Sequence, residues 1–459
     1  MTVISKSISS TGNRKIFTVS VWVKRANGIS GGNGSIFCVG TANSDSGKFR
    51  FVIDSSNRVK VEGGATNFRT SEAVLTDQFG WYHLVCAVDS TDSTADNRVR
   101  VWLNGEQITT WTTNNTMSQD QNTPVNESGK THYINIEADG ASGNFKGYFA
   151  HFHLVDGTAY PPTTFGETDS TTGIWKPKAD PSGISYGTNG VFLKFENSGN
   201  MGLDSSGQTN NYTIASAGTL PQTTDTPSNN FAVLNPYNRR NTNSNPTYAH
   251  GNLFIDNQDQ DGQGNNWCST IAGLTKGKWY CEITPHINGS AASSMKIGVV
   301  ASSSDARNGS FQSGDRTGVQ YYYIGNGNKL YSAETTSGAT SETSYGDTFA
   351  TDDIIGIFLD LDNGTLKFSK NGTIQNSGTA AFTDLLTNMN YSGYMFAGGI
   401  GTAGQYNQNQ IKGANFGNPR LSISSSQADA NGYGNFEYTP NDGSYNYYAL
   451  CTKNLQEFN

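Results

Sequence analysis

The sequence is poor in charged residues. Asp, Glu, Lys and Arg together make up 15% of its 459 residues, against roughly 25% in ordinary soluble domains. Ser, Thr, Asn and 53 glycines take their place, and these residues favour strands, turns and loops over helices. Aromatic residues reach 11%, which suits packed sheets. The composition therefore predicts a large, mostly β protein.

Runs of basic residues, long apolar segments and regular repeats are missing as well. No cluster of lysine or arginine occurs and the formal net charge is −8, so the phosphate-neutralising charge on which nucleic-acid binding depends is lacking. No apolar segment approaches the roughly 20 residues of a membrane span, and residues 1–24 lack the continuous apolar stretch of a signal peptide. The absence of heptads and of a short fixed repeat excludes a coiled-coil shaft and a β-helix. We therefore expect folding in a cytosol, with neither a nucleic-acid partner nor membrane insertion.

Cysteines are few and odd in number. The five lie mostly inside strand-like segments, at Cys38, Cys86, Cys268, Cys281 and Cys451. This pattern predicts buried free thiols and argues against a disulfide framework.

Many short segments alternate apolar and polar residues, the period of a strand with one buried face. Two of them, residues 16–24 and 81–89, have apolar faces made of Phe17, Val19, Val21 and Val23, and of Tyr82, Leu84, Cys86 and Val88. Short strands separated by turns in this way are typical of an antiparallel sandwich or jelly roll.

Asn-Gly pairs predict tight turns between these strands. Three pairs stand at the ends of alternating segments: Asn104-Gly105, Asn363-Gly364 and Asn371-Gly372. Asn-Gly is preferred where both turn residues need a positive φ. The only segment in which we expect a helical turn is residues 382–389.

These signals predict an all-β protein with two antiparallel β-sandwich domains of jelly-roll type. Residues 1–200 form the first domain and residues 251–459 the second. Residues 201–250 are rich in Thr, Asn, Ser and Pro and show little alternation, so we expect an extended connector there.

Motifs for catalysis are incomplete. Ser30 lies in "GISGG", which matches G-x-S-x-G, but that motif requires a helix after the turn and here another strand-like segment follows. Glu137 and Asp139 share a strand face, as the paired carboxylates of jelly-roll glycosidases do. Ser142 stands three residues beyond Asp139, where a glutamate is needed. We therefore expect no enzyme, with a polysaccharide depolymerase using Glu137 and Asp139 as a less favoured alternative.

Metal ligands are also sparse. His151 and His153 share a strand face, as metal-binding histidines can, but no third ligand is evident. Two acidic loops are weak calcium candidates: Asp89, Asp92 and Asp96 lie in one, and Asp259 and Asp261 in the other. The second loop begins like an EF-hand but has a cysteine where the closing glutamate belongs. We expect no cofactor, with calcium in these loops as the alternative.

The remaining candidates for ligand binding are aromatic residues beside polar segments. Trp111, Trp267, Tyr321 and Tyr323 are the candidate ligand contacts. Sugar rings stack their apolar faces on such side chains, and protein interfaces are enriched in them. The pattern favours binding over catalysis.

Several strings resemble known domains. "FTVSVWVK", "WYHLVCAVD" and "RVRVWLNG" resemble the laminin G-like, concanavalin A-like sandwich, whereas "GKWYCEI", "MKIGVV" and "DIIGIFLDLDNGTLKFSKNG" resemble a SPRY domain. The joining text, such as "HFHLVDGTAYPPTTFGETDSTTGIWKPK" and "TTDTPSNNFAVLNPYN", is similar to virion proteins of tailed bacteriophages that infect marine bacteria and cyanobacteria.

This resemblance implies a non-enzymatic virion surface protein, in the class of tail-fibre or receptor-binding components, that recognises a host-surface glycan or protein. A capsid or tail decoration protein with a purely structural role is the alternative. Other virion proteins would then be its partners, and we expect self-association, as a trimer on a fibre.

Overall fold

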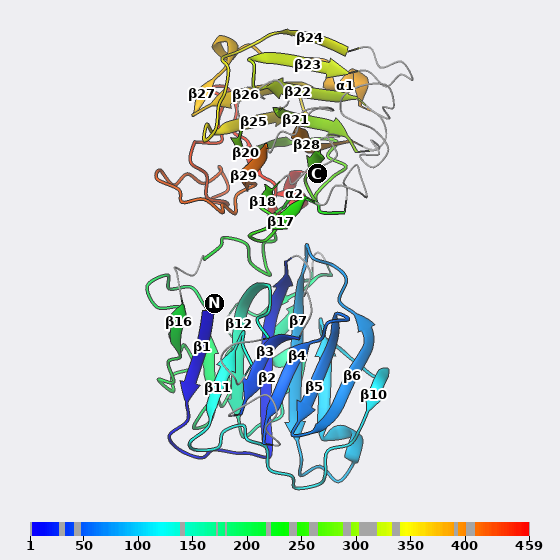
Figure 1. Ribbon diagram of the computed structural model, residues 1–459, viewed down its shortest axis with the longest axis vertical. Helices are drawn as coiled ribbons and strands as arrows, with labels where there is room; N and C mark the ends of the chain where they lie inside the picture. Colours follow the sequence, from blue (N-terminus) through cyan, green and yellow to red (C-terminus); the bar gives the residue numbers. More distant parts are fainter. Residues whose placement is uncertain are drawn as a thin grey trace. The chain divides into compact units, whose positions relative to one another are not determined.

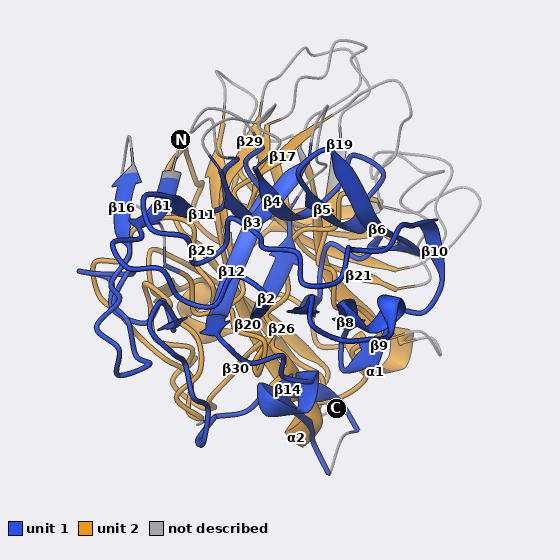
Figure 2. Cartoon of the chain, turned by 90° about the horizontal axis from the view of Figure 1, so that it is seen from below, with its two compact units in different colours: residues 1–222 blue, residues 223–459 orange. Residues whose placement is uncertain are grey.

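The computed structural model describes residues 2–26, 33–40, 47–137, 143–170, 173–179, 181–216, 222–237, 246–256, 265–287, 295–302, 319–332, 340–389, 393–400 and 409–458. The chain divides into two compact units, Met1–Gln222 and Thr223–Asn459 (Figure 2). Strands make up 45% of the structure and helices 5%. The expected all-β class is confirmed.

Unit 1 contains two large antiparallel sheets. Sheet 1A pairs its strands in the order β10 (Trp111–Asn114), β6 (Thr66–Val74), β5 (Arg58–Gly63), β4 (Phe49–Ile53), β3 (Gly34–Val39), β11 (Thr131–Ile134), β1 (Thr2–Ser7) and β16 (Thr213–Ser216). Sheet 1B has the order β15 (Val191–Leu193), β12 (Gly147–Asp156), β2 (Ile16–Arg25), β7 (Trp81–Asp89), β8 (Val99–Leu103) and β9 (Glu106–Gln107). The smaller elements are η1 (Ala95–Asn97), η2 (Pro162–Thr164), β13 (Gly166–Thr168) and β14 (Trp175–Pro177).

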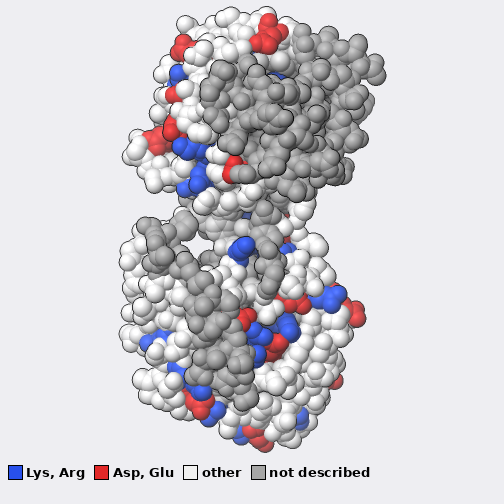
Figure 3. All heavy atoms as spheres, in the orientation of Figure 1, with Lys and Arg blue, Asp and Glu red and all other residues white. Residues whose placement is uncertain are grey.

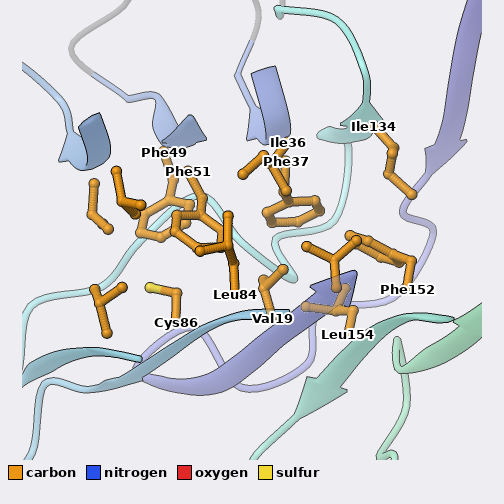
Figure 4. Packing of buried hydrophobic residues seen from close by; sticks show 14 of the residues in the cluster. Val19, Ile36, Phe37, Phe49, Phe51, Leu84, Cys86, Ile134, Phe152 and Leu154 are labelled. Atoms are coloured by element: carbon orange, nitrogen blue, oxygen red, sulfur yellow. The ribbon is translucent and has the colours of Figure 1, made fainter. Parts of the chain in front are cut away.

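The core of unit 1 lies between these sheets. Figure 4 shows Phe49 and Phe51 of sheet 1A pointing toward Val19, Leu84 and Cys86 of sheet 1B. All four apolar residues predicted on one face of residues 16–24 belong to this cluster. The alternation therefore predicted the buried face of these strands correctly.

Unit 2 is a second pair of sheets (Figure 1). Sheet 2A has the order β17 (Thr247–Ala249), β18 (Phe254–Asp256), β29 (Gln410–Asn415), β20 (Lys278–His286), β25 (Ile355–Asp360), β26 (Thr365–Lys370) and β27 (Thr373–Ile374), and β30 (Tyr448–Ala449) pairs with β20. Sheet 2B has the order β19 (Asn265–Cys268), β28 (Tyr394–Ile400), β21 (Met295–Ala301), β22 (Gln320–Ile324), β23 (Asn328–Ser332) and β24 (Thr340–Ser344). The remaining elements are η4 (Asn376–Gly378), α1 (Leu385–Asn388) and α2 (Thr452–Phe458).

Residues 201–250, expected as a connector, are shared between the units. In unit 1, β16 extends sheet 1A by pairing with β1, and Tyr212 lies in the core. In unit 2, Phe231 forms a bridge with Cys451, and Leu234 forms one with Ser269. These described parts of the segment are thus built into the two sandwiches.

The Asn-Gly turns differ from one another. Asn104-Gly105 and Asn371-Gly372 are two-residue turns in which both residues have a positive φ, as expected. At Asn363-Gly364 the prediction is wrong, because four residues separate β25 from β26 and only the glycine has a positive φ. Asp360 explains the wider loop: its Oδ1 accepts hydrogen bonds from two successive backbone N–H groups.

The helix prediction is correct in one place and incomplete in another. The helix α1 lies within residues 382–389, but α2 was not expected. Its sequence, TKNLQEF, contains helix formers but is too short to show a 3.6-residue period. The five cysteines are free and buried, as predicted.

Candidate functional site

A pocket of about 280 Å³ opens in unit 1 where the ends of several strands meet. Its walls come from four separate parts of the chain: Arg14 before β2, residues 47–48 before β4, the turn from β5 to β6, and residues 121–127 before β11. Most of these segments are connections, which are the usual place for recognition residues on a rigid scaffold.

The turn between β5 and β6 depends on two glycines. Gly63 pairs with Thr66 across the hairpin, and a Cβ at Gly63 would overlap the ring of Phe68. Gly64 has a φ of 60°, which suits glycine, and its N–H donates to the carbonyl of Lys48 at 2.7 Å. The pocket wall is thereby fixed to the start of β4.

Arg14 joins this frame to the segment before β11. Its Nε donates to the carbonyl oxygen of Thr123 at 2.8 Å. The carbonyl of Arg14 accepts in return from the Thr123 N–H at 3.0 Å and hydroxyl at 2.8 Å. Its Nη1 lies 3.0 Å from Oε1 of Glu127. Four short contacts thus hold one arginine in place.

Other polar groups of the pocket are open to a ligand. The Gln121 Oε1 accepts from the Ser118 N–H at 3.2 Å, which leaves its amide nitrogen for a ligand. Asn122 and Thr66 are exposed, and within the described part of the chain their side chains make no hydrogen bond. Amide and hydroxyl groups both donate and accept, so the pocket matches a ligand rich in hydroxyl groups. No sequence pattern had indicated these residues.

The predicted aromatic contacts lie elsewhere. Trp267, Tyr321 and Tyr323 are 0% exposed, so the expectation that they face a ligand is wrong. They lie on sheet 2B, and the ring of Tyr323 packs 5.4 Å from that of Phe368 on sheet 2A. The strand β22, which carries both tyrosines, is buried on both of its faces despite its polar sequence neighbours.

Trp111 is half-buried at the rim of the unit 1 core. The guanidinium of Arg69 lies 5.5 Å from the centre of its ring, within cation–π range. Arg69 is itself 2% exposed. One face of the indole is therefore already covered by the protein, and Trp111 as a ligand contact stays a prediction that concerns its other face.

Arginines organise the acidic loop that contains Asp89, Asp92 and Asp96. The Arg98 Nε donates to the Asp92 carbonyl at 2.8 Å, and its Nη1 donates to the Met117 carbonyl at 2.9 Å. The Arg69 Nη2 contacts Asp96 Oδ1 at 3.4 Å. Guanidinium groups thus contact oxygens that a calcium ion would use. Asp259 and Asp261 lie outside the described residues, within which no group of three or more His, Cys, Asp or Glu side chains could hold a metal ion.

His151 and His153 belong to an aromatic cluster on the outer side of sheet 1B. His153 stacks on Phe192 with 3.9 Å between ring centres, and its Nδ1 lies 2.8 Å from the Tyr186 hydroxyl. Burial holds its pKa well below the ordinary value. A bulge in β12 and a φ of 46° at His151 interrupt the alternation between the two histidines. These contacts indicate a structural role for the two histidines.

A buried serine–histidine pair had no sequence signal. Ser20 Oγ lies 2.8 Å from Nε2 of His83, and the Trp175 Nε1–H donates to Nδ1 of His83 at 2.9 Å. Since indole only donates, Nδ1 of His83 carries no proton, and the neutral ring must donate from Nε2 to Ser20. A general base requires the opposite arrangement, so this pair does not activate the serine.

Of the two carboxylates considered for catalysis, Glu137 is neutralised by an arginine and Asp139 is not described by the structure. Glu137 is 5% exposed and lies 2.8 Å from Nη1 of Arg50, while Asp139 lies outside the described residues. Arg50 also binds Glu62. Burial raises the pKa of Glu62, but Lys60 and Arg50 outweigh burial and bring the pKa below its usual value. A glycosidase acid needs the opposite shift.

A second pocket, of about 220 Å³, lies on unit 2 and contains Glu282 and Glu437. Burial raises the pKa of Glu282, whereas hydrogen bonds from Ser424 lower that of Glu437, which is the pattern of an acid–base pair. However, each Glu282 oxygen already accepts two hydrogen bonds, one of them from the backbone of residues 437–438. We therefore assign Glu282 to anchoring this segment.

Two family models match the chain. Residues 3–163 match the concanavalin A-like lectin/glucanases superfamily, and residues 278–394 match the SPRY domain. The chain carries a concanavalin A-like domain and a SPRY domain. The first match extends from β1 through β12 and includes every residue that lines the pocket described above.

Known proteins are similar to parts of the chain. A Xenopus laevis ATP-dependent RNA helicase, DDX1, is 29% identical over 139 residues, which span 30% of this chain and 16% of that protein. The human HERC1 SPRY domain has a TM-score of 0.29, 15% identity, and coverage of 39% of this chain and 95% of its own. Domains LG4-5 of mouse laminin alpha1 have a TM-score of 0.26, 8% identity, and coverage of 90% and 85%. None of the three bears on what this chain binds.

Two further observations concern the surface charge and the helices. Among the described residues on the face shown in Figure 3, acidic and basic side chains are interspersed and neither sign gathers into a large patch. No helix in the described part of the chain is long and apolar enough to cross a membrane.

Proposed function

We propose that the chain is a non-enzymatic structural protein of a tailed-bacteriophage virion, in the class of tail-fibre or receptor-binding components, and that it binds a host-surface glycan or protein. Two lectin-like, binding-type domains fit an adhesin-like role. The similarity of the joining segments to virion proteins supplies the viral part of the proposal. The observation that carries the binding function is the pocket of unit 1, whose open amide and hydroxyl groups lie on a rigid frame.

In this proposal the protein joins the virion in the bacterial cytoplasm and contacts other tail, fibre or capsid proteins. It self-associates, as a trimer if it lies on a fibre, because virion components occur in symmetric copies. Light scattering of the purified chain gives the number of copies, and a reconstruction of the intact particle gives its location. A position on the capsid with the pocket covered by neighbours would instead indicate a decoration protein.

The binding function is tested with the full chain on a panel of host cells and their purified surface glycans. The variant Gln121→Ala/Asn122→Ala removes two pocket amides, and each lost hydrogen bond costs about 0.5–1.5 kcal/mol. We expect binding to weaken by roughly tenfold or more. Gln107→Ala is the matched control, because Gln107 is exposed on β9, outside the pocket. Equal binding by the double variant and this control would refute the pocket as the contact.

A further inference from the structure

The Arg14–Glu127 ion pair leaves one donor and one acceptor unused. Arg14 Nη1 contacts Glu127 Oε1 at 3.0 Å, and both side chains are 29% exposed. The Arg14 Nε is occupied by the Thr123 carbonyl. Within the described part of the chain, neither Nη2 of Arg14 nor Oε2 of Glu127 makes a hydrogen bond. Both residues line the pocket, so this ion pair keeps one N–H group and one carboxylate oxygen available for a ligand.

This pair is held in place before any ligand arrives. Thr123 is 3% exposed and exchanges three hydrogen bonds with Arg14, all between 2.8 and 3.0 Å. The Glu127 N–H donates to the Pro124 carbonyl at 3.3 Å, which holds its backbone in a turn. Long charged side chains normally lose rotamer freedom when they bind a ligand. Here the protein has already ordered them, so their contacts contribute more fully to affinity.

We infer that the Arg14–Glu127 pair recognises two adjacent hydroxyl groups of a neutral pyranose, an inference that rests on the function proposed above. One hydroxyl donates its hydrogen to Glu127 Oε2, and its neighbour accepts one from Arg14 Nη2. Each sugar hydroxyl can donate and accept, so a vicinal pair satisfies both groups at once. Hydrogen bonds to charged groups are the strong ones, and this contact therefore determines selectivity, while the amides of Gln121 and Asn122 take further hydroxyls.

The Glu127 carboxylate disfavours an anionic group at Arg14 Nη2, whereas Lys48 adds a positive charge elsewhere on the pocket wall. A carboxylated pyranose that placed its anionic group on Arg14 Nη2 would bring it beside the Glu127 carboxylate. Like charges at short range repel, and Arg14 is already neutralised by its partner at 3.0 Å. A neutral diol meets no such repulsion.

The test is a cycle that pairs one protein change with one ligand change, measured by calorimetry on the full chain. The probes are the methyl glycosides of glucose, mannose and galactose, each with its analogues that lack a single ring hydroxyl. Glu127→Gln keeps the shape of the side chain and removes its charge. Asp120→Asn is the matched control, because Asp120 forms an exposed ion pair with Lys15 outside the pocket.

In the natural chain we expect loss of either of two adjacent hydroxyls to weaken binding at least tenfold. In Glu127→Gln, loss of the hydroxyl that donates to Glu127 should cost less than threefold, since the partner of that hydroxyl is already altered. Asp120→Asn should behave as the natural chain. A penalty of equal size in all three proteins overturns this inference but leaves glycan binding intact. If no glycoside and no host glycan binds, the inference and the glycan form of the proposed function fail together.

Discussion

Acid should unfold unit 1 before unit 2, because unit 1 buries histidines in the neutral state. Burial lowers the pKa of His83 and of His132 to about 3, and it holds the pKa of His153 well below its ordinary value. The two histidines of unit 2, His250 and His286, are exposed or half-buried. The two sandwiches therefore respond differently to pH, although both are built from antiparallel sheets.

The direction and the size of this pH effect on the stability of unit 1 follow from proton linkage. Above pH 6.5 these histidines are neutral in the folded and unfolded states, so they add no pH dependence. Below pH 6.5 these histidines bind protons in the unfolded chain but not in the folded unit. Each such group then lowers the free energy of unfolding by about 1.4 kcal/mol per pH unit. Three groups remove roughly 4 kcal/mol per pH unit, or about 6 kcal/mol between pH 6.5 and 5. That is comparable to the entire stability of an ordinary domain.

Urea unfolding of the full chain at several pH values between 7.5 and 5, with hydrogen exchange to distinguish the units, measures this effect. His132→Gln is the informative variant, because it should reduce the slope for unit 1 by about one third whatever it does to absolute stability. Asp156 opposes the effect only at lower pH: burial raises its pKa from 3.8, so its protonation favours the fold. A unit 1 slope below about 1.4 kcal/mol per pH unit, or earlier unfolding of unit 2, would refute the reasoning.

Three other changes have defined outcomes. Gly63→Ala should destabilise unit 1 by about 1–3 kcal/mol, because the new methyl group overlaps the Phe68 ring; an unchanged melting temperature would contradict the tight turn. Glu282→Gln should destabilise unit 2 by about 1–3 kcal/mol, since an amide nitrogen cannot accept the hydrogen bonds that the carboxylate receives; calorimetry that shows no shift would remove its anchoring role. Millimolar calcium should leave the melting temperature of unit 1 unchanged, because Arg98 already binds carbonyls of its acidic loop; a clear rise for unit 1 would show that the ion has a site there.

The strands were predictable because their signal is local. Alternation places successive side chains on opposite faces, and the faces expected for residues 16–24 and 81–89 are those in the core. The Asn-Gly turns at 104–105 and 371–372 were predictable because the pair itself suits the turn, and the hydrogen bonds that Asn104 and Asn371 accept from His83 and Ile354 are compatible with it. At Asn363-Gly364 the carboxylate of Asp360 accepts from the loop backbone, and this interaction changes the turn without changing the strand pairing.

The site was not predictable, because the pocket is a product of tertiary structure. Arg14 and Glu127 are 113 positions apart, and Gly63 belongs to a third segment. The only local hints were the adjacent glycines at 63–64 and the run of amides at 121–122, which are common in any polar loop. Tyr321 and Tyr323 failed as candidates for a related reason: polar sequence neighbours suggested exposure, but β22 is buried on both faces and Tyr323 packs against Phe368 of the opposing sheet.

The contrast between buried and open polar groups argues for binding over catalysis. At His83 the tautomer is set by Trp175, at Glu137 the charge is cancelled by Arg50, and at Glu282 the protein already supplies donors to both oxygens. In each case the group that a reaction would need is already engaged inside the fold. Arg14 and Glu127 differ, because each keeps one hydrogen-bonding atom free beside a pocket. Groups that are rigid, open and mutually neutralised hold a ligand without activating it, and for this reason we propose recognition as the role of this chain.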